Sequence, residues 1–164
     1  MKRYSSASIA NAFLNRAFAE KKTISPMKIQ KLLYIAHGYS LVERDEPLLD
    51  EVSEAWKFGP VLNSLYHQCK YFRRHGVNRY LLEIDQDSME RRPSPIPEDE
   101  YVGDIVDFVW ETYGNELPMN LSAWTHEKGG PWDTVTDGGS NILLHMEVPN
   151  ALIRDYFKER MYDK

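Results

Sequence analysis

Cysteine is almost absent from this 164-residue chain, in which Cys69 stands alone. A single cysteine cannot form an internal disulfide or a zinc site with several thiolates, so a reducing compartment is the simplest interpretation. No segment approaches the roughly 18 uninterrupted apolar residues of a membrane-spanning helix, and the N-terminal segment lacks the apolar core of a secretory signal. We therefore expect a cytoplasmic protein that does not associate with membranes.

The motifs of several common enzyme classes are also missing. The sequence contains no GxxxxGKS/T phosphate loop, no GxGxxG, no HExxH and no GxSxG. No motif therefore supports an assignment as a nucleotide-binding protein, a zinc protease or a serine hydrolase. The histidines are scattered, and no two have the close spacing typical of a zinc site: they are His37, His67, His75, His126 and His145. We expect no catalytic residues, no cofactor and no bound metal.

Positive charge is in short supply. The chain has 20 Lys and Arg against 25 Asp and Glu, which gives a net charge of -5. A nucleic-acid partner would have to bind a local basic patch, so the composition favours a protein partner instead. With 42% hydrophobic and 27% charged residues, the chain resembles an ordinary globular domain that folds without a partner.

Most of the chain carries apolar residues at helical spacing. Ser25 and Pro26 mark one helix start, since serine caps well and proline is tolerated in the first turn. The helix that follows is apolar around most of its circumference, and we expect it to be the central, most buried one. The spacing predicts helices at about residues 6–20, 26–42, 60–72, 101–113, 117–127 and 149–161.

The β structure is expected to be small. Alternation predicts a strand at about residues 52–58, ended by Gly59-Pro60 at a corner that leads directly into a helix, and a second strand at about 79–84 pairs with it. The proline-rich segment at about 85–100 is predicted to be an exposed loop, and Pro131-Trp132 to lie in a turn or loop. The predicted fold is mainly α with a small β element (α+β), with about five to six helices and a two- or three-stranded sheet or hairpin.

Several aromatic and histidine residues allow two interpretations. His37 is either a core imidazole with its nitrogens bound internally, or part of a polar pocket shared with Tyr34 and His126. Trp56 and Phe58 either pack inward from the strand or face a partner, and an interface role is the alternative to core packing for Trp132.

Three blocks, in this order and spacing, resemble a known family. They are KLLYIAHGY at residues 31–39, EAWKFGPV at 54–61, and Thr125-His126 followed by Pro131-Trp132. Together they resemble the Panacea antitoxin domain of SocA-like and GepA-like proteins, which occurs in bacterial and prophage toxin–antitoxin operons. The resemblance covers about residues 6–158, so we expect a single Panacea-like domain over residues 1–164 with no separate DNA-binding segment.

The resemblance implies a mainly helical antitoxin that neutralises a cognate toxin protein by direct binding. The resemblance also implies a role as an adaptor that delivers the toxin to a ClpXP-type protease for degradation. The family supplies no catalytic residues, and its motif positions are the candidate partner-binding residues: Tyr34, His37, Trp56, Phe58, Pro60, His126 and Trp132. The alternative is an uncharacterised enzyme or small-ligand binder that uses the histidine–tyrosine pocket between helices.

Overall fold

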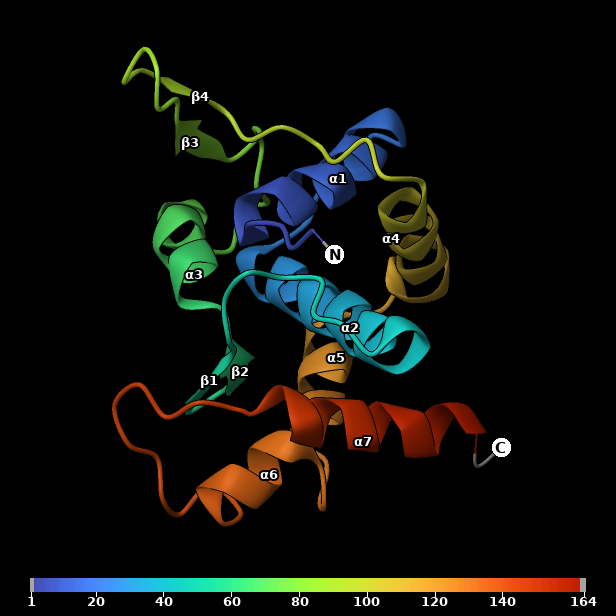
Figure 1. Ribbon diagram of the computed structural model, residues 1–164. Coiled ribbons are helices and arrows are strands. Elements are labelled where there is room, and N and C mark those ends of the chain that lie inside the picture. The colour runs from blue at the N-terminus through green and yellow to red at the C-terminus, as the bar shows by residue number, and fades with distance from the viewer. Residues whose placement is uncertain (1, 163–164) are drawn as a thin grey trace.

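Helix α2 (Pro26–Arg44) lies at the centre of the computed structural model, which describes residues 2–162. It contacts α1, α3, α4, α5 and α7, and Figure 1 shows it between α1 and α7. The other α-helices are α1 (Ser6–Ala19), α3 (Asn63–Cys69), α4 (Glu100–Tyr113), α5 (Pro118–Thr125), α6 (Pro131–Thr136) and α7 (Asn150–Tyr162), and a 3-10 turn, η1 (Lys70–Phe72), follows α3. The described residues therefore form a mainly α fold with a small β element, as predicted.

The first two helices begin where their capping residues indicate. The Ser5 hydroxyl accepts a hydrogen bond from the Ser8 backbone N–H at 3.1 Å. The Ser25 hydroxyl accepts one from the Lys28 backbone N–H at 3.2 Å, and Pro26 occupies the first turn. Each cap satisfies a backbone donor that has no partner inside its helix.

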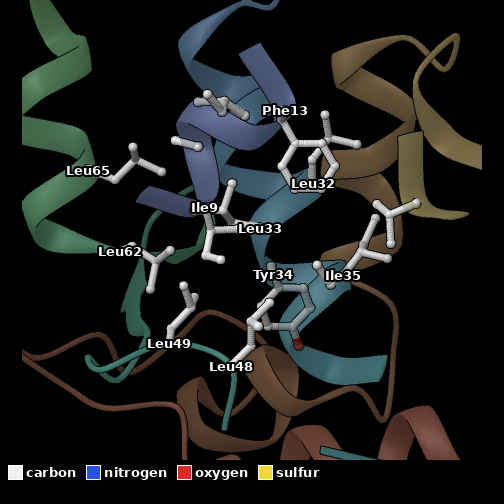
Figure 2. Packing of buried hydrophobic residues seen from close by; sticks show 14 of the residues in the cluster. Ile9, Phe13, Leu32, Leu33, Tyr34, Ile35, Leu48, Leu49, Leu62 and Leu65 are labelled. Carbon is white, nitrogen blue, oxygen red and sulfur yellow. The ribbon is translucent and has the colours of Figure 1, made fainter. Parts of the chain in front are cut away.

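The hydrophobic core surrounds α2 on most sides, which confirms the prediction of a central helix. Apolar side chains of α2 are fully or nearly fully buried against neighbouring elements. Figure 2 shows this packing between α2, α1, the segment before β1 and the start of α3, with Ile9, Phe13, Leu32, Leu33, Tyr34, Ile35, Leu48, Leu49, Leu62 and Leu65 labelled. Within residues 2–162, no helix combines the length and apolar character needed to cross a membrane.

The first β element is a hairpin, which corrects the predicted strand-to-helix corner. Strand β1 (Glu54–Trp56) pairs antiparallel with β2 (Gly59–Val61), and α3 begins only after β2. Pro60 therefore lies in a strand, opposite Ala55, and not in the first turn of a helix. Gly59 has φ +111°, a conformation that side chains with a Cβ rarely adopt. A two-stranded hairpin tolerates proline because its outer edge needs no N–H donor.

The second β element is also a local hairpin, and the predicted pairing of residues 79–84 with the first strand is wrong. Strand β3 (Leu82–Ile84) pairs with β4 (Arg91–Pro93), which lies inside the segment predicted to be a loop. Arg92 Nη2 lies 2.9 Å from Glu83 Oε1, and Arg92 Nη1 lies 2.5 Å from Asp85 Oδ2. Pairing two nearby strands closes a much shorter loop than pairing with β1. The hairpin projects from the helical body in Figure 1.

Pro131 and Trp132 begin α6 and do not lie in a loop, a further correction. Proline fits the first turn of a helix, as it does in α2 and α5. The indole of Trp132 is held by the first hairpin, because its Nε1 donates a hydrogen bond to the backbone oxygen of Trp56 at 2.7 Å. A tertiary contact thus supports a helix too short to be stable alone.

The close approach of α7 to α2 gives a testable prediction about Gly38. A Cβ at Gly38 would lie 2.5 Å from the Phe157 ring, whereas a Cβ at Gly103 in α4 would meet nothing within 4 Å. We expect Gly38→Ala to lower the free energy of unfolding by about 1–3 kcal/mol through overpacking. Gly103→Ala, the matched control, should raise it by about 0.5–1 kcal/mol through helix propensity.

Urea unfolding of both variants measures this difference. Equal stabilisation by the two substitutions would show that α7 does not pack on α2 at Gly38.

Candidate functional site

Five of the seven candidate residues gather around the β1–β2 hairpin, and two lie elsewhere. Trp56, Phe58 and Pro60 belong to the hairpin, and His126 and Trp132 approach it from α5 and α6. The remaining two, Tyr34 and His37, are buried along α2 in the core.

Trp132 and His126 contact the β1–β2 hairpin and each other. Besides its hydrogen bond to Trp56, Trp132 packs its ring against the imidazole of His126, with ring centroids 4.4 Å apart. His126 Nδ1 donates to the backbone oxygen of Ser122 at 2.7 Å. Only 7% of the Trp132 surface is exposed and His126 is half-buried, so Trp132 positions the hairpin and does not offer a free surface.

Trp56 and Phe58 are exposed to different degrees. The half-buried Trp56 donates from Nε1 to Glu54 Oε2 at 2.8 Å, and its ring meets Tyr66 edge to face, with ring centroids 4.7 Å apart. Phe58 lies at the hairpin turn and is 67% exposed. A phenylalanine this exposed contributes little to the fold, which makes it a candidate for partner contact.

Lys31 lies beneath the same hairpin, although the sequence did not single it out. Its Nζ donates hydrogen bonds to the backbone oxygens of Phe58 at 3.3 Å and Pro60 at 3.4 Å. Next to it, the Gln30 amide both donates to the backbone oxygen of Leu62 at 3.0 Å and accepts from the Leu62 N–H at 2.9 Å. Two adjacent polar side chains of α2 therefore hold the hairpin and the start of α3.

The charge of Lys31 is the unusual feature of this junction. The residue is 2% exposed, and within residues 2–162 no carboxylate forms an ion pair with it. Burial lowers the pKa of the Lys31 ammonium from 10.5 to about 8, because the charged form loses hydration without gaining a countercharge. A buried charge without a counterion is costly, and such groups concentrate at functional sites.

Gly59 makes room for this ammonium. A Cβ at Gly59 would lie 2.8 Å from Lys31 Nζ and 3.0 Å from Thr125 Oγ1. The positive φ of Gly59 therefore favours glycine, and a side chain there would also displace the Lys31 ammonium.

His37 is a core imidazole with both ring nitrogens bound. Its Nδ1 accepts from the Leu49 N–H at 3.3 Å, so the proton resides on Nε2, which lies 2.8 Å from Asn150 Oδ1 and donates to it. Burial lowers the pKa of His37 and favours the neutral ring. His37 therefore connects α2 to the segment before β1 and to the first residue of α7, while His126 has other partners.

Tyr34 packs its ring against Phe157, with ring centroids 5.8 Å apart. Its buried hydroxyl has no hydrogen-bond partner among the described residues, and burial raises the pKa of the phenol. Among residues 2–162, no group of three or more His, Cys, Asp or Glu side chains could hold a metal ion.

An open groove of about 900 Å³ runs beside the hairpin. We call it the hairpin groove; its lining comes from the first turns of α2, the β1–β2 hairpin, α3 with η1 and the two arginines after it, and the start of α5 with Leu117 before it. Apolar groups dominate the lining, and Lys31 is among the lining residues. An open apolar groove with few polar groups is the usual form of a binding site.

A family model described as antitoxin SocA-like, Panacea domain, matches residues 29–133. The chain belongs to this antitoxin family. It is 35% identical over 155 residues to a protein named Antitoxin SocA from Caulobacter vibrioides (strain NA1000 / CB15N), an alignment that covers 92% of this chain and 80% of that protein. No solved structure matches the chain.

The family match includes the whole hairpin and its supports. Residues 29–133 begin just before Gln30 and end just after Trp132. The resemblance stated from the three sequence blocks is therefore confirmed at the level of the family.

The bonding of His37 predicts a structural and not a functional role. His37→Ala should lower the free energy of unfolding by at least about 1–3 kcal/mol, because it leaves the buried Leu49 N–H and the Asn150 side chain unpaired. Tyr34→Phe is the control from the same helix. Its unpartnered hydroxyl predicts unchanged or higher stability.

Thermal and urea unfolding of the two variants test this contrast. A His37→Ala protein with wild-type stability and no activity would instead support a functional imidazole.

The buried charge of Lys31 predicts a specific pH dependence of stability. Between pH 8 and pH 10.5 the unfolded chain binds more protons at Lys31 than the folded chain does, so rising pH favours the folded state. The free energy of unfolding of the wild type should rise relative to Lys31→Met by up to about 1.4 kcal/mol per pH unit in this range.

Urea unfolding of both proteins at pH 7, 8, 9 and 10 gives the difference directly. The other ionisable groups are common to both proteins, so their contributions to the pH dependence cancel in the difference. A difference that does not change with pH would contradict a buried, unpaired ammonium.

Proposed function

We propose that this protein is an antitoxin that neutralises a cognate toxin protein by direct binding, with the hairpin groove as part of the contact surface. Membership of the SocA-like family supports the antitoxin role. The single structural observation that supports the location is Phe58, which is 67% exposed at the edge of an apolar groove.

Binding alone is sufficient for neutralisation. A specific interface of standard size buries about 1,600 Å² in total, and a few aromatic or arginine side chains near its centre supply most of the affinity. The hairpin groove offers Trp56, Phe58 and Tyr66 for that purpose, with Arg73 and Arg74 beside them. The supporting residues, Trp132 and His126 among them, hold the hairpin in place and so pre-organise this surface.

The alternative, an enzyme or small-ligand binder built on Tyr34, His37 and His126, finds little support in the geometry. Both nitrogens of His37 have partners in the core, and His126 contacts a different set of residues, with its Nδ1 bound to Ser122 and its ring packed on Trp132. A catalytic group needs a free lone pair or proton within reach of a substrate.

The test is co-expression with the product of the neighbouring gene. We expect growth rescue and a complex that co-elutes in size-exclusion chromatography. Phe58→Ala should weaken that complex by about tenfold or more, since a central aromatic residue usually contributes above 1 kcal/mol. Leu144→Ala, at a residue 87% exposed outside the groove, serves as the matched control.

Failure of the wild-type chain to bind or to rescue growth would contradict the proposed function. The adaptor role needs a separate comparison, in which the toxin is incubated with ClpXP with and without this protein. Faster degradation of the toxin in its presence supports an adaptor. Growth rescue that is unchanged in a host without ClpP would leave binding as the mechanism and remove the adaptor role.

A further inference from the structure

Several large hydrophobic side chains that line the hairpin groove leave much of their surface exposed. Five of them are at least 40% exposed: Met27, Phe58, Tyr66, Leu117 and Met119. Single exposed apolar residues are normal, but a contiguous set around a groove marks a place where another molecule binds.

The groove is also positively charged in a protein whose net charge is -5. Lys57, Lys70, Arg73 and Arg74 line it and are exposed, and none of them forms an ion pair with a carboxylate in the described part of the chain. None of the described lining residues is acidic. The local field of the groove therefore attracts negative charge, against the trend of the whole chain.

Lys31 supplies a more specific observation at the floor of the groove. Its ammonium has three N–H donors, and the two hydrogen bonds it makes, to Phe58 and Pro60, are long at 3.3 and 3.4 Å. Both acceptors are neutral carbonyl groups. A carboxylate that entered the groove would give this buried cation the countercharge that the chain itself does not provide.

We propose that the hairpin groove binds an acidic, amphipathic segment of the partner protein, in which one carboxylate pairs with Lys31 and apolar side chains cover Phe58 and Met119. The inference rests on the proposed function, because the segment is assigned to the toxin. It adds the chemistry that the partner must present, which is a carboxylate flanked by apolar residues in a stretch of net negative charge.

A nucleic acid fits this groove less well than a peptide. Phosphates would pair with the exposed Arg73 and Arg74 but would leave Lys31, which is 2% exposed, without a countercharge. A nucleic acid would also leave most of the apolar side chains at the groove uncovered, because only a base stacked on Phe58 would contact them. A carboxylate on a short side chain is small enough to follow apolar neighbours into the groove.

The test uses the purified toxin from the neighbouring gene, titrated into the full chain by calorimetry. Lys31→Met should weaken the complex by at least about thirtyfold, the usual result of removing one partner from a buried charge pair. The double variant Arg73→Glu, Arg74→Glu should weaken it by about tenfold or more, and the loss should shrink as salt rises. Its control is Lys128→Glu, Lys158→Glu, which changes the charge equally at exposed positions outside the groove.

A second readout separates pairing from a structural effect of the substitution. At pH 8.5, binding to the wild type should be accompanied by proton uptake, measured as a dependence of the binding heat on the ionisation enthalpy of the buffer. Pairing with a carboxylate favours the charged form of Lys31, so uptake should disappear in Lys31→Met. The unfolding midpoint of each variant is measured alongside.

The outcomes distinguish the two proposals. If the wild type neither binds nor neutralises the toxin, the proposed function and this inference both fail. If it does bind and both groove variants bind equally well, the function stands and the groove assignment is overturned. A third outcome would overturn the inference in favour of a nucleic acid. The wild type would bind a single-stranded RNA 30-mer at physiological salt and the arginine double variant would not, while the groove variants would bind the toxin as tightly as the wild type.

Discussion

The middle of helix α2 is buried around almost its whole circumference, so most polar side chains there bond to partners inside the protein, the Tyr34 hydroxyl being an exception. Gln30 bonds both backbone groups of Leu62, His37 joins Leu49 to Asn150, and the Ser40 hydroxyl donates to the backbone oxygen of Glu46 at 2.9 Å. Most of these partners lie in the chain that follows the helix. The buried polar groups of α2 therefore determine where residues 46–62 run, and with them the position of the first hairpin.

Lys31 obeys the same constraint but only in part. Two backbone oxygens accept hydrogen bonds from Lys31, but both are uncharged, so the buried ammonium has no countercharge. Such a residue lowers stability compared with an apolar side chain of similar shape, and proteins accept that cost most often where a ligand or partner completes the site. The surrounding hairpin is well held by Trp132, so a partner meets a rigid surface and not one that must first be ordered.

Most of the helical fold could be predicted from the sequence, because caps and apolar spacing are local signals: Ser25 and Pro26 mark the start of α2 as they should. The β elements were harder. Gly59-Pro60 fits a helix start as well as a tight hairpin, and only the tertiary contacts of Lys31 and Trp132 decide between them.

Only part of the candidate site could be predicted, because the contacts that complete it are also tertiary. Its aromatic residues are visible in the sequence, but a lysine inside an apolar helix is usually assigned to solvent. The signal that could have found Lys31 is the helix itself, which has no polar face on which a lysine could lie. A crystal structure of the complex with the toxin shows whether a carboxylate of the partner pairs with Lys31. We expect a partner carboxylate oxygen about 2.7–2.9 Å from Lys31 Nζ. A toxin bound to another face, with the hairpin groove open to solvent, would contradict it.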